Sequence, residues 1–293
     1  AAYSSGKPAL GVGAGNTPAV IDETADVEMA VSYILMSKTF DNGMICASEQ
    51  SVVAVKDVYE KVKKEMQFRG AYILSKDEAE KLSKIILTEK MTVNPAIVGQ
   101  SAATIAKLAG FDVPAHAKVL VSEETSTDRA NPFAHEKLSP ILALYKADNF
   151  NRATDMALEL VNLGGVGHTS VLYTDSRSQE RIDYFATKLP TGRLLINSPS
   201  SQGGIGDLFN FKLEPSLTLG CGSWGGNSVS ENVGVTFAEL QNRCRKERKY
   251  VVVPGSPENL FQTRSRRSGA ARAGRQKTRL YRHRPLFVRF RHR

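Results

Sequence analysis

Hydrophobic residues between positions 1 and 196 follow two different periods. Short runs of aliphatic and β-branched residues predict buried strands, and stretches with an apolar residue every three or four positions predict amphipathic helices between them. The predicted strands are 9–12, 19–21, 51–55, 118–121, 141–145, 170–173 and 193–196. The predicted helices are one that begins after Asp26, followed by 57–67, 76–87, 102–109, 151–163 and 179–189. Strands that alternate with helices of this length indicate an α/β fold with a largely parallel sheet flanked by helices.

Local capping signals mark three helix ends. Asp26 stands before an apolar-periodic stretch, Ser75 and Glu78 have the spacing of a capping box, and Gly110 follows the last periodic residue of 102–109. An Asp or Ser at the N-cap accepts hydrogen bonds from free backbone N–H groups, and Gly tolerates the left-handed conformation of a helix end.

Two Gly-rich segments interrupt this alternation. Gly11, Gly13 and Gly15 have the spacing G-x-G-x-G, which lacks the third Gly of the dinucleotide fingerprint and leads into another strand. We interpret them as a tight turn between two strands. Residues 198–227 are rich in Gly and Ser and have little periodicity. An irregular segment of that length is more often a functional loop than a spacer.

Composition sets the broad class of the protein. Hydrophobic residues make up 41% and charged residues 24% of the 293 residues, as in ordinary globular domains. No apolar run is long enough for a membrane helix, and the start of the chain lacks the form of a signal peptide. The three Cys residues include no CxxC pair and cannot build a disulfide framework. A reducing, cytoplasmic setting without a membrane partner is therefore predicted.

The net charge of +9 comes from the C-terminal part of the chain. Residues 236–293 contain 17 Lys and Arg against 3 Asp and Glu, whereas residues 1–235 contain 22 against 27. A mildly acidic body is therefore followed by an Arg-rich tail. Clustered cations of this kind leave a non-enzymatic, basic-tailed nucleic-acid-binding protein as an alternative function.

Cys46 is the first candidate for chemistry. It follows a polar, Gly-containing turn and is predicted to start a helical segment, where backbone N–H groups and the helix dipole favour a thiolate. The alternative is a small buried hydrophobe, which is the common state of a Cys between Ile and Ala. Cys221 and Cys244 have no comparable setting.

Two histidines stand in contexts that need interpretation. His135 and Glu136 are adjacent, but no second His follows at helical spacing, so a zinc-protease motif is absent and no metal site is predicted. His168 follows a Gly-rich turn and enters a predicted strand, where a lone His is commonly a hydrogen-bonded structural residue.

Four motifs, taken in order, resemble one enzyme family. They are FDNGMICASEQ at 40–50, PFAHEKLSP at 132–140, GGVGHTS at 164–170 and INSPSSQGGIGDLFNFKLEPSLTLGCGSWGGNS at 196–228. Residues 1 to about 235 resemble the CoA-acylating aldehyde dehydrogenases, in particular the aldehyde dehydrogenase half of the bifunctional aldehyde-alcohol dehydrogenases of fermenting microbes. The resemblance implies an aldehyde dehydrogenase-like catalytic domain and an NAD-dependent reaction that interconverts acetyl-CoA plus NADH with acetaldehyde, coenzyme A and NAD.

The resemblance also implies a role for each candidate residue. Cys46 falls on the family's nucleophile, which attacks the aldehyde carbon and, after hydride transfer to NAD, carries a thioester that the thiol of coenzyme A accepts. Glu136 falls on the Glu that holds the nicotinamide ribose, although Leu138 replaces the aromatic residue of the wider superfamily. His168 falls on an active-site His near the coenzyme A thiol or the thioester.

One difference from hydrolytic aldehyde dehydrogenases favours a thiol acceptor. Those enzymes carry a general-base Glu 34 residues before the nucleophile, and the corresponding residue here is Val12. Without a base to activate it, water attacks the thioester slowly, and coenzyme A becomes the natural acceptor.

The resemblance divides the chain into three predicted segments. Residues 1–14 are a remnant of the NAD-binding domain, whose pyrophosphate loop and oxyanion-stabilising Asn would precede Ala1. Residues 15–235 form the catalytic domain, and residues 236–293 form the basic tail. Because most of the nucleotide-binding domain is missing on this interpretation, the chain alone is expected to be inactive.

The tail has a further interpretation. The tail residues can be encoded by several synonymous codons. With suitable codons, reading the gene one nucleotide later gives amino-acid sequences that resemble the family's linker and the first strand of its iron-dependent alcohol dehydrogenase domain. We therefore predict a frameshift between Val235 and Cys244, followed by a disordered tail. Iron binding and self-association into dimers or filaments would then belong to the parent protein, and this chain would act on small-molecule aldehydes and acyl-CoA without a nucleic-acid partner.

Overall fold

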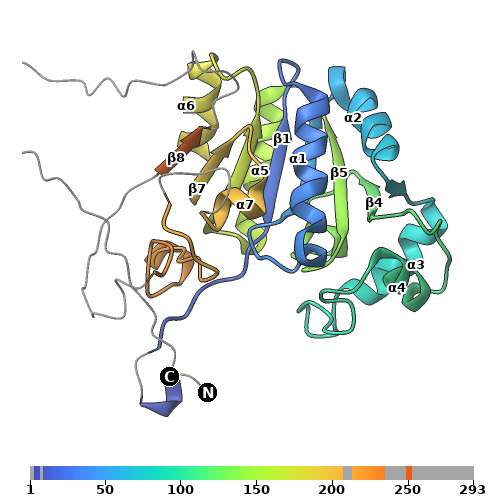
Figure 1. Ribbon diagram of the computed structural model, residues 1–293, viewed down its shortest axis with the longest axis horizontal. Coiled ribbons are helices and arrows are strands. Elements are labelled where there is room, and N and C mark those ends of the chain that lie inside the picture. Colours follow the sequence, from blue (N-terminus) through green and yellow to red (C-terminus); the bar gives the residue numbers. More distant parts are fainter. Residues whose placement is uncertain (1–2, 7–8, 207–212, 235–248, 253–293) are drawn as a thin grey trace, which may run out of the picture. The chain divides into compact units, whose positions relative to one another are not determined.

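A parallel sheet forms the centre of the molecule (Figure 1). The computed structural model describes residues 3–6, 9–206, 213–234 and 249–252. Within these residues the sheet has eight strands in the order β3-β4-β5-β2-β1-β6-β7-β8, and every neighbouring pair is parallel. The strands are β1 (Thr17–Ile21), β2 (Glu49–Val55), β3 (Ala71–Ile73), β4 (Val119–Glu124), β5 (Ile141–Ala147), β6 (Gly167–Tyr173), β7 (Thr191–Ile196) and β8 (Lys249–Val252).

Helices cover both faces of this sheet. The helices are α1 (Val27–Thr39), α2 (Lys56–Phe68), α3 (Lys76–Ile86), α4 (Ala102–Ala109), α5 (Phe150–Gly164), α6 (Gln179–Lys188) and α7 (Ser200–Gly204). Short 3-10 helices are η1 (Tyr3–Ser5), η2 (Phe40–Gly43), η3 (Pro132–Ala134) and η4 (Ser223–Gly225). The α/β architecture predicted from the alternation of periods is therefore confirmed.

Successive side chains along each strand point to opposite faces of the sheet, so the hydrophobic core has two layers. Ala19 and Ile21 of β1 pack into the cluster that α1 and α2 complete, whereas Val20 between them packs into the cluster that contains α5 and α6. Each of these three side chains is fully buried. Burial of one large aliphatic side chain contributes about 1.5–3 kcal/mol, so the two layers hold the central strands rigidly in place.

The predicted capping signals are confirmed. The Asp26 side chain accepts from Met29 N, and Ser75 with Glu78 forms a complete capping box at the start of α3. Gly110 ends α4 in the left-handed conformation at φ 83°. Local residue chemistry therefore determines these helix ends.

The predicted strand at 9–12 is wrong. Residues 9–16 form no regular element, and the side chains of Leu10 and Val12 are 46% and 43% exposed. Glycines at alternate positions leave a strand few side chains to pack, which weakens it. The segment is held instead by residues distant in sequence: Gly13 N donates to Asn227 Oδ1 at 2.7 Å, and Ser228 N donates to Gly11 O. The predicted tight turn between two strands is therefore an extended segment that leads into β1.

The Gly/Ser-rich segment and the tail each contain structure that the periodicity does not indicate. The short helix α7 and the turn η4 lie within 198–227. In the predicted basic tail, β8 pairs with β7 in register. The other tail residues, 235–248 and 253–293, and the predicted frameshift between Val235 and Cys244 lie outside the described residues.

Candidate active site

The candidate side chains meet at the amino-terminal edge of the sheet. Cys46 precedes β2, Glu136 precedes β5, His168 is the second residue of β6, and Arg193 is the third residue of β7. Ligands of open parallel α/β sheets usually bind at the opposite, carboxyl edge. The position of this site therefore could not be inferred from the fold class alone.

Cys46 and His168 are in direct contact. His168 Nε2 lies 3.1 Å from Cys46 Sγ, and His168 Nδ1 lies 2.9 Å from Thr169 Oγ1. Burial, with a smaller contribution from the nearby Arg193 charge, lowers the pKa of His168 to about 3. The imidazole is therefore neutral at physiological pH and can exchange a proton with the thiol at Nε2.

The thiol of Cys46 is protonated at neutral pH in its buried environment. Burial raises the pKa of Cys46 to about 11, and the charges of Glu136 and Cys221 raise it as well, whereas Arg193 lowers it. The prediction that Cys46 starts a helix is wrong: Cys46 lies in a turn, closed by a hydrogen bond from Ser48 N to Ile45 O, that leads directly into β2. A helix dipole therefore cannot supply the thiolate, and a proton acceptor has to.

Two glycines make room for this arrangement. A Cβ on Gly15 would lie 2.1 Å from the Cys46 carbonyl oxygen, and a Cβ on Gly167 would lie 1.9 Å from the Cys221 carbonyl oxygen. Gly167 also has φ +81°, a conformation that costs other residues energy. The backbone at Gly15 and Gly167 therefore lies against the carbonyl groups of Cys46 and Cys221. Because Gly167 precedes His168, these close approaches set the distance between Cys46 and His168.

Glu136 faces the same site from the loop before β5. Its Oε1 accepts from Gly15 N at 2.9 Å, while no described residue donates a hydrogen bond to Oε2. Burial raises the pKa of Glu136 to about 7, and the charges of Lys38 and Lys137 oppose this shift. A carboxylate with one oxygen available can accept hydrogen bonds from the vicinal hydroxyls of a ribose, so Glu136 fits the nucleotide contact predicted for it.

A buried polar network lies behind Glu136. Gln50 Oε1 accepts from Lys137 N at 2.9 Å and from Lys38 Nζ at 3.3 Å. Lys137 Nζ donates to the carbonyls of Phe133 and His135. Both lysine side chains are fully buried, and burial lowers the pKa of Lys38 to about 7. The network holds the Glu136 loop against β2, the strand that follows the Cys46 turn.

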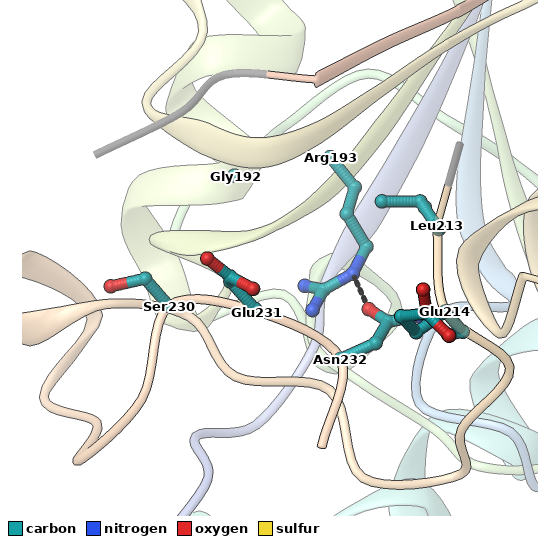
Figure 2. Close-up of a pocket in the computed structure, with 7 residues that line it drawn as sticks. All are labelled: Gly192, Arg193, Leu213, Glu214, Ser230, Glu231 and Asn232. Carbon is teal, nitrogen blue, oxygen red and sulfur yellow. Dashed lines mark hydrogen bonds between the residues drawn. The ribbon is translucent and has the colours of Figure 1, made fainter. Parts of the chain in front are cut away.

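Sequence reasoning missed Arg193 and dismissed Cys221. Arg193 is 2% exposed, and its Nε donates to Asn232 Oδ1 at 2.8 Å, as Figure 2 shows. Its guanidinium lies within hydrogen-bonding reach of the Cys221 sulfur. The sequence offered one signal of this role. Arg193 begins a predicted apolar strand, and an Arg that is buried with its strand needs partners for its charge, because an unpaired Arg is rarely buried.

Two other expectations concern membranes and metals. Among the described residues, no helix is long and apolar enough to cross a bilayer. In the same part of the chain, no three His, Cys, Asp or Glu side chains are grouped so that they could hold a metal ion.

Comparison with known proteins places the chain among aldehyde dehydrogenases. The family model for the aldehyde dehydrogenase family matches residues 1–207. The bifunctional aldehyde-alcohol dehydrogenase of Escherichia coli K12 is 61% identical over 262 residues, which is 89% of this chain and 29% of that protein. The chain thus spans about three tenths of the length of this curated relative.

Two solved structures share the fold. An acetylating aldehyde dehydrogenase from Geobacillus thermoglucosidasius is 43% identical with a TM-score of 0.75, over 80% of this chain and 51% of that chain. A propionaldehyde dehydrogenase from Rhodopseudomonas palustris, solved with bound CoA and an acylated cysteine, is 28% identical with a TM-score of 0.66, over 75% of this chain and 48% of that chain. No support for a nucleic-acid-binding protein emerges from these comparisons.

Proposed function

We propose, from the premise that the chain belongs to the aldehyde dehydrogenase family, that it carries the acyl-transfer centre of a CoA-acylating aldehyde dehydrogenase. The substrate pair would be acetaldehyde and acetyl-CoA, with NAD as the nucleotide. One observation carries this proposal: the Cys46 sulfur lies 3.1 Å from a buried, neutral imidazole at the edge of the sheet.

Acyl transfer from acyl-CoA follows from this geometry. His168 Nε2 takes the proton of Cys46, and the sulfur attacks the thioester carbonyl. The bond between the carbonyl carbon and the coenzyme A sulfur then breaks, and His168 returns the proton to the leaving thiolate. The products are acyl-Cys46 and free coenzyme A, and His168 is neutral again. The reverse sequence releases acyl-CoA.

The aldehyde reaction uses the same sulfur. Attack of Cys46 on the aldehyde carbon gives a thiohemiacetal, and the backbone N–H of Cys46 is the candidate donor for its oxygen. NAD, when bound, supplies the hydride acceptor. Glu136 would hold its ribose hydroxyls through Oε2, while the bond from Gly15 N keeps Oε1 in place.

The residues around Cys46 favour a thiol over water as the acyl acceptor. Val12, at the position where hydrolytic relatives carry their general base, has an apolar side chain that cannot take a proton from water. His168 can return its proton to a departing coenzyme A thiolate without any second base.

The remaining properties belong to the proposed parent protein. The E. coli relative is bifunctional, and this supports a parent that joins the aldehyde dehydrogenase to an iron-dependent alcohol dehydrogenase. Self-association into dimers or filaments and a cytoplasmic location are proposed for that parent on the same resemblance.

Acylation by acetyl-CoA alone tests the proposal without requiring NAD. The purified chain is incubated with acetyl-CoA, and the acetyl group is located by peptide mass spectrometry while released coenzyme A is measured with a thiol reagent. We expect one acetyl group on Cys46 and an equal amount of free coenzyme A. Cys46→Ser should abolish both signals, and Cys244→Ser, which removes a thiol that has no predicted role at the site, serves as the matched control. Acetylation that survives Cys46→Ser would refute the assignment of the nucleophile.

A further inference from the structure

Arg193 is a buried cation whose hydrogen bonds do not fully satisfy it. Its side chain is almost completely excluded from solvent, and none of the residues that the structure describes forms a hydrogen bond with the buried Nη1. Desolvation of a charge is costly unless another group compensates it. A guanidinium kept in this state, whose charge acts on the thiols of Cys46 and Cys221, calls for a role in the chemistry of the site.

The surroundings of Arg193 fix its guanidinium in one place. Asn232 Oδ1 accepts from Nε, and Asn232 Nδ2 donates to the carbonyls of Gly204 and Glu214. Figure 2 shows the side chain extending from β7 towards Asn232, beside a cavity of about 20 Å³ that Glu214 and Glu231 also line.

The sheet places this cation next to the reacting pair. Arg193 in β7 is directly opposite Thr169 in β6, the residue that follows His168 and contacts its Nδ1. Gly204, held by Asn232, lies so close to Ala47 that an added Cβ would be 2.8 Å from the Ala47 Cβ. Arg193 is therefore linked to the neighbour of Cys46 through Asn232 and Gly204, and to the neighbour of His168 through the pairing of β7 with β6.

Cys221 links Arg193 to the site. Its S–H donates to Leu219 O at 3.5 Å, so the lone pairs of its sulfur face the Gly13 N–H and the guanidinium. Cys221 also packs against Gly167, the residue before His168. The Cys221 side chain thus contacts the cation and lies against β6, the strand that carries His168.

We propose that Arg193 is a positioning residue for acyl transfer: its buried charge, held by Asn232 and Cys221, stabilises the Cys46 thiolate that forms when the thiol passes its proton to His168. The inference rests on the proposed function only in taking Cys46 as the group that reacts.

The charges that face Cys46 support this role. They come from Glu136 in the loop before β5, His168 in β6, Arg193 in β7 and Cys221 in the segment after α7. Glu136 and Cys221 raise the pKa of Cys46, the imidazole is neutral, and Arg193 is the cation among the described residues that lowers it. Removal of an opposite charge at such a site commonly shifts a pKa by one unit or more.

The test is the pH dependence of Cys46 alkylation in the purified chain. Iodoacetamide reacts with thiolates, and peptide mass spectrometry separates modification of Cys46 from that of Cys221. Arg193→Met and Arg193→Gln remove the charge, and Arg193→Lys keeps it while losing the planar fork. Arg177→Met is the matched control, because the Arg177 side chain is 79% exposed.

We expect the uncharged variants to raise the midpoint of Cys46 alkylation by about one pH unit, which is about a tenfold slower reaction at pH 8. Arg193→Lys should stay within about half a unit of the wild type, and Arg177→Met should leave the midpoint unchanged. Unchanged midpoints in the uncharged variants would overturn the proposal. So would an equal shift in Arg193→Lys, since a purely structural role makes charge irrelevant.

Folding and the proposed function are controlled separately. If neither uncharged variant keeps the wild-type circular dichroism spectrum, Arg193→Lys decides alone, and a midpoint shifted by a full unit overturns the inference. Acetyl transfer from acetyl-CoA is measured in parallel. A wild-type chain that alkylates normally but takes no acetyl group refutes the proposed function, while the alkylation profiles still report on Arg193.

Discussion

Burial determines the protonation state of the residues at this site more than any single neighbouring charge. It is the largest cause of the raised pKa values of Cys46, Glu49 and Glu136, and of the lowered pKa values of Lys38 and His168. Each of these shifts favours the neutral form. The thiol of Cys46 and the imidazole of His168 are therefore neutral beside the buried Arg193, and we propose that proton transfer between these two groups, rather than a standing thiolate, starts the chemistry.

The neutral state of His168 gives a direct prediction. Because its pKa lies near 3, the imidazole should show no titration between about pH 5 and pH 8, whereas an unperturbed His changes charge near pH 6.5. The NMR signals of the histidine ring, assigned by their loss in His168→Gln, provide the measurement. A titration midpoint between pH 6 and 7 would show that the ring is not desolvated as the structure indicates. His168→Gln should also slow acetyl transfer to Cys46 by about 10²-fold or more.

Glu49 predicts a pH dependence of stability. This residue is fully buried; its Oε1 accepts from Ser200 N at 2.9 Å, and burial raises its pKa to about 7 from an ordinary value of 4.5. Between these two pH values the folded chain binds more protons than the unfolded chain, so the contribution of Glu49 to stability falls as the pH rises through this window.

Urea unfolding at pH 5 and pH 8 measures this contribution. Glu49→Gln should reduce the loss of unfolding free energy between these pH values by on the order of 2 kcal/mol. Glu60→Gln is the matched control, because the Glu60 side chain is 67% exposed. If wild type and Glu49→Gln have parallel pH profiles, the Glu49 carboxyl is not buried in the way described.

At the scale of elements, the site is built by the segments that enter the strands. Cys46, Glu136 and the Gly15 N–H all belong to loops that precede β2, β5 and β1. At position 15 the loop before β1 approaches Cys46, and at position 167 the start of β6 approaches Cys221, at distances that only glycine allows. The geometry of the reacting atoms therefore depends on loop backbones as much as on the strands.

Gly167→Ala tests this dependence. An added Cβ would overlap the Cys221 carbonyl and force a residue with φ +81° into strain, so His168 should move away from Cys46. We expect a loss of stability of about 1–3 kcal/mol or more and at least tenfold slower acetyl transfer. Gly164→Ala, where no atom lies within 4 Å of the added Cβ, should be neutral in both assays. Equal behaviour of the two variants, measured by urea unfolding and acetyl release, would contradict this account.

The elements show how far the sequence could predict this fold. Strands and helices whose periodicity and caps agree, such as α3 and α4, were predicted to within one or two residues. The strand at 9–12 failed because the apolar residues alternate with glycines, and its contacts come from residues near 225–228. The three-residue β3 was missed because so short a run carries no period.

The residues of the site were predictable to different degrees. Cys46, Glu136 and His168 were indicated by family motifs, and the structure brings all three to one edge of the sheet. The helix start proposed for Cys46 failed because the polar turn leads into a strand. Arg193 could not be assigned, since its role depends on β6 and β7 being neighbours, and no local pattern encodes that pairing.

At the scale of the whole molecule, the chain belongs to the aldehyde dehydrogenase family, and we propose that it contains the acyl-transfer part of such an enzyme. One parallel sheet carries the proposed nucleophile, its proposed proton acceptor and a buried cation on its strands or on the loops before them. Acyl exchange with coenzyme A needs only these groups. The proposed acyl exchange can therefore be measured without nucleotide binding.

Isotope exchange between acetyl-CoA and coenzyme A tests whether Cys46 accepts the acetyl group and returns it to coenzyme A. The purified chain is mixed with unlabelled acetyl-CoA and labelled coenzyme A, with no nucleotide, and the label that enters acetyl-CoA is followed with time. If Cys46 accepts the acetyl group and returns it to coenzyme A, the wild type should exchange label and Cys46→Ser should show only the uncatalysed rate. Exchange that is equally fast in both proteins, or absent from a wild-type chain whose Cys46 is alkylated normally by iodoacetamide, would contradict the account.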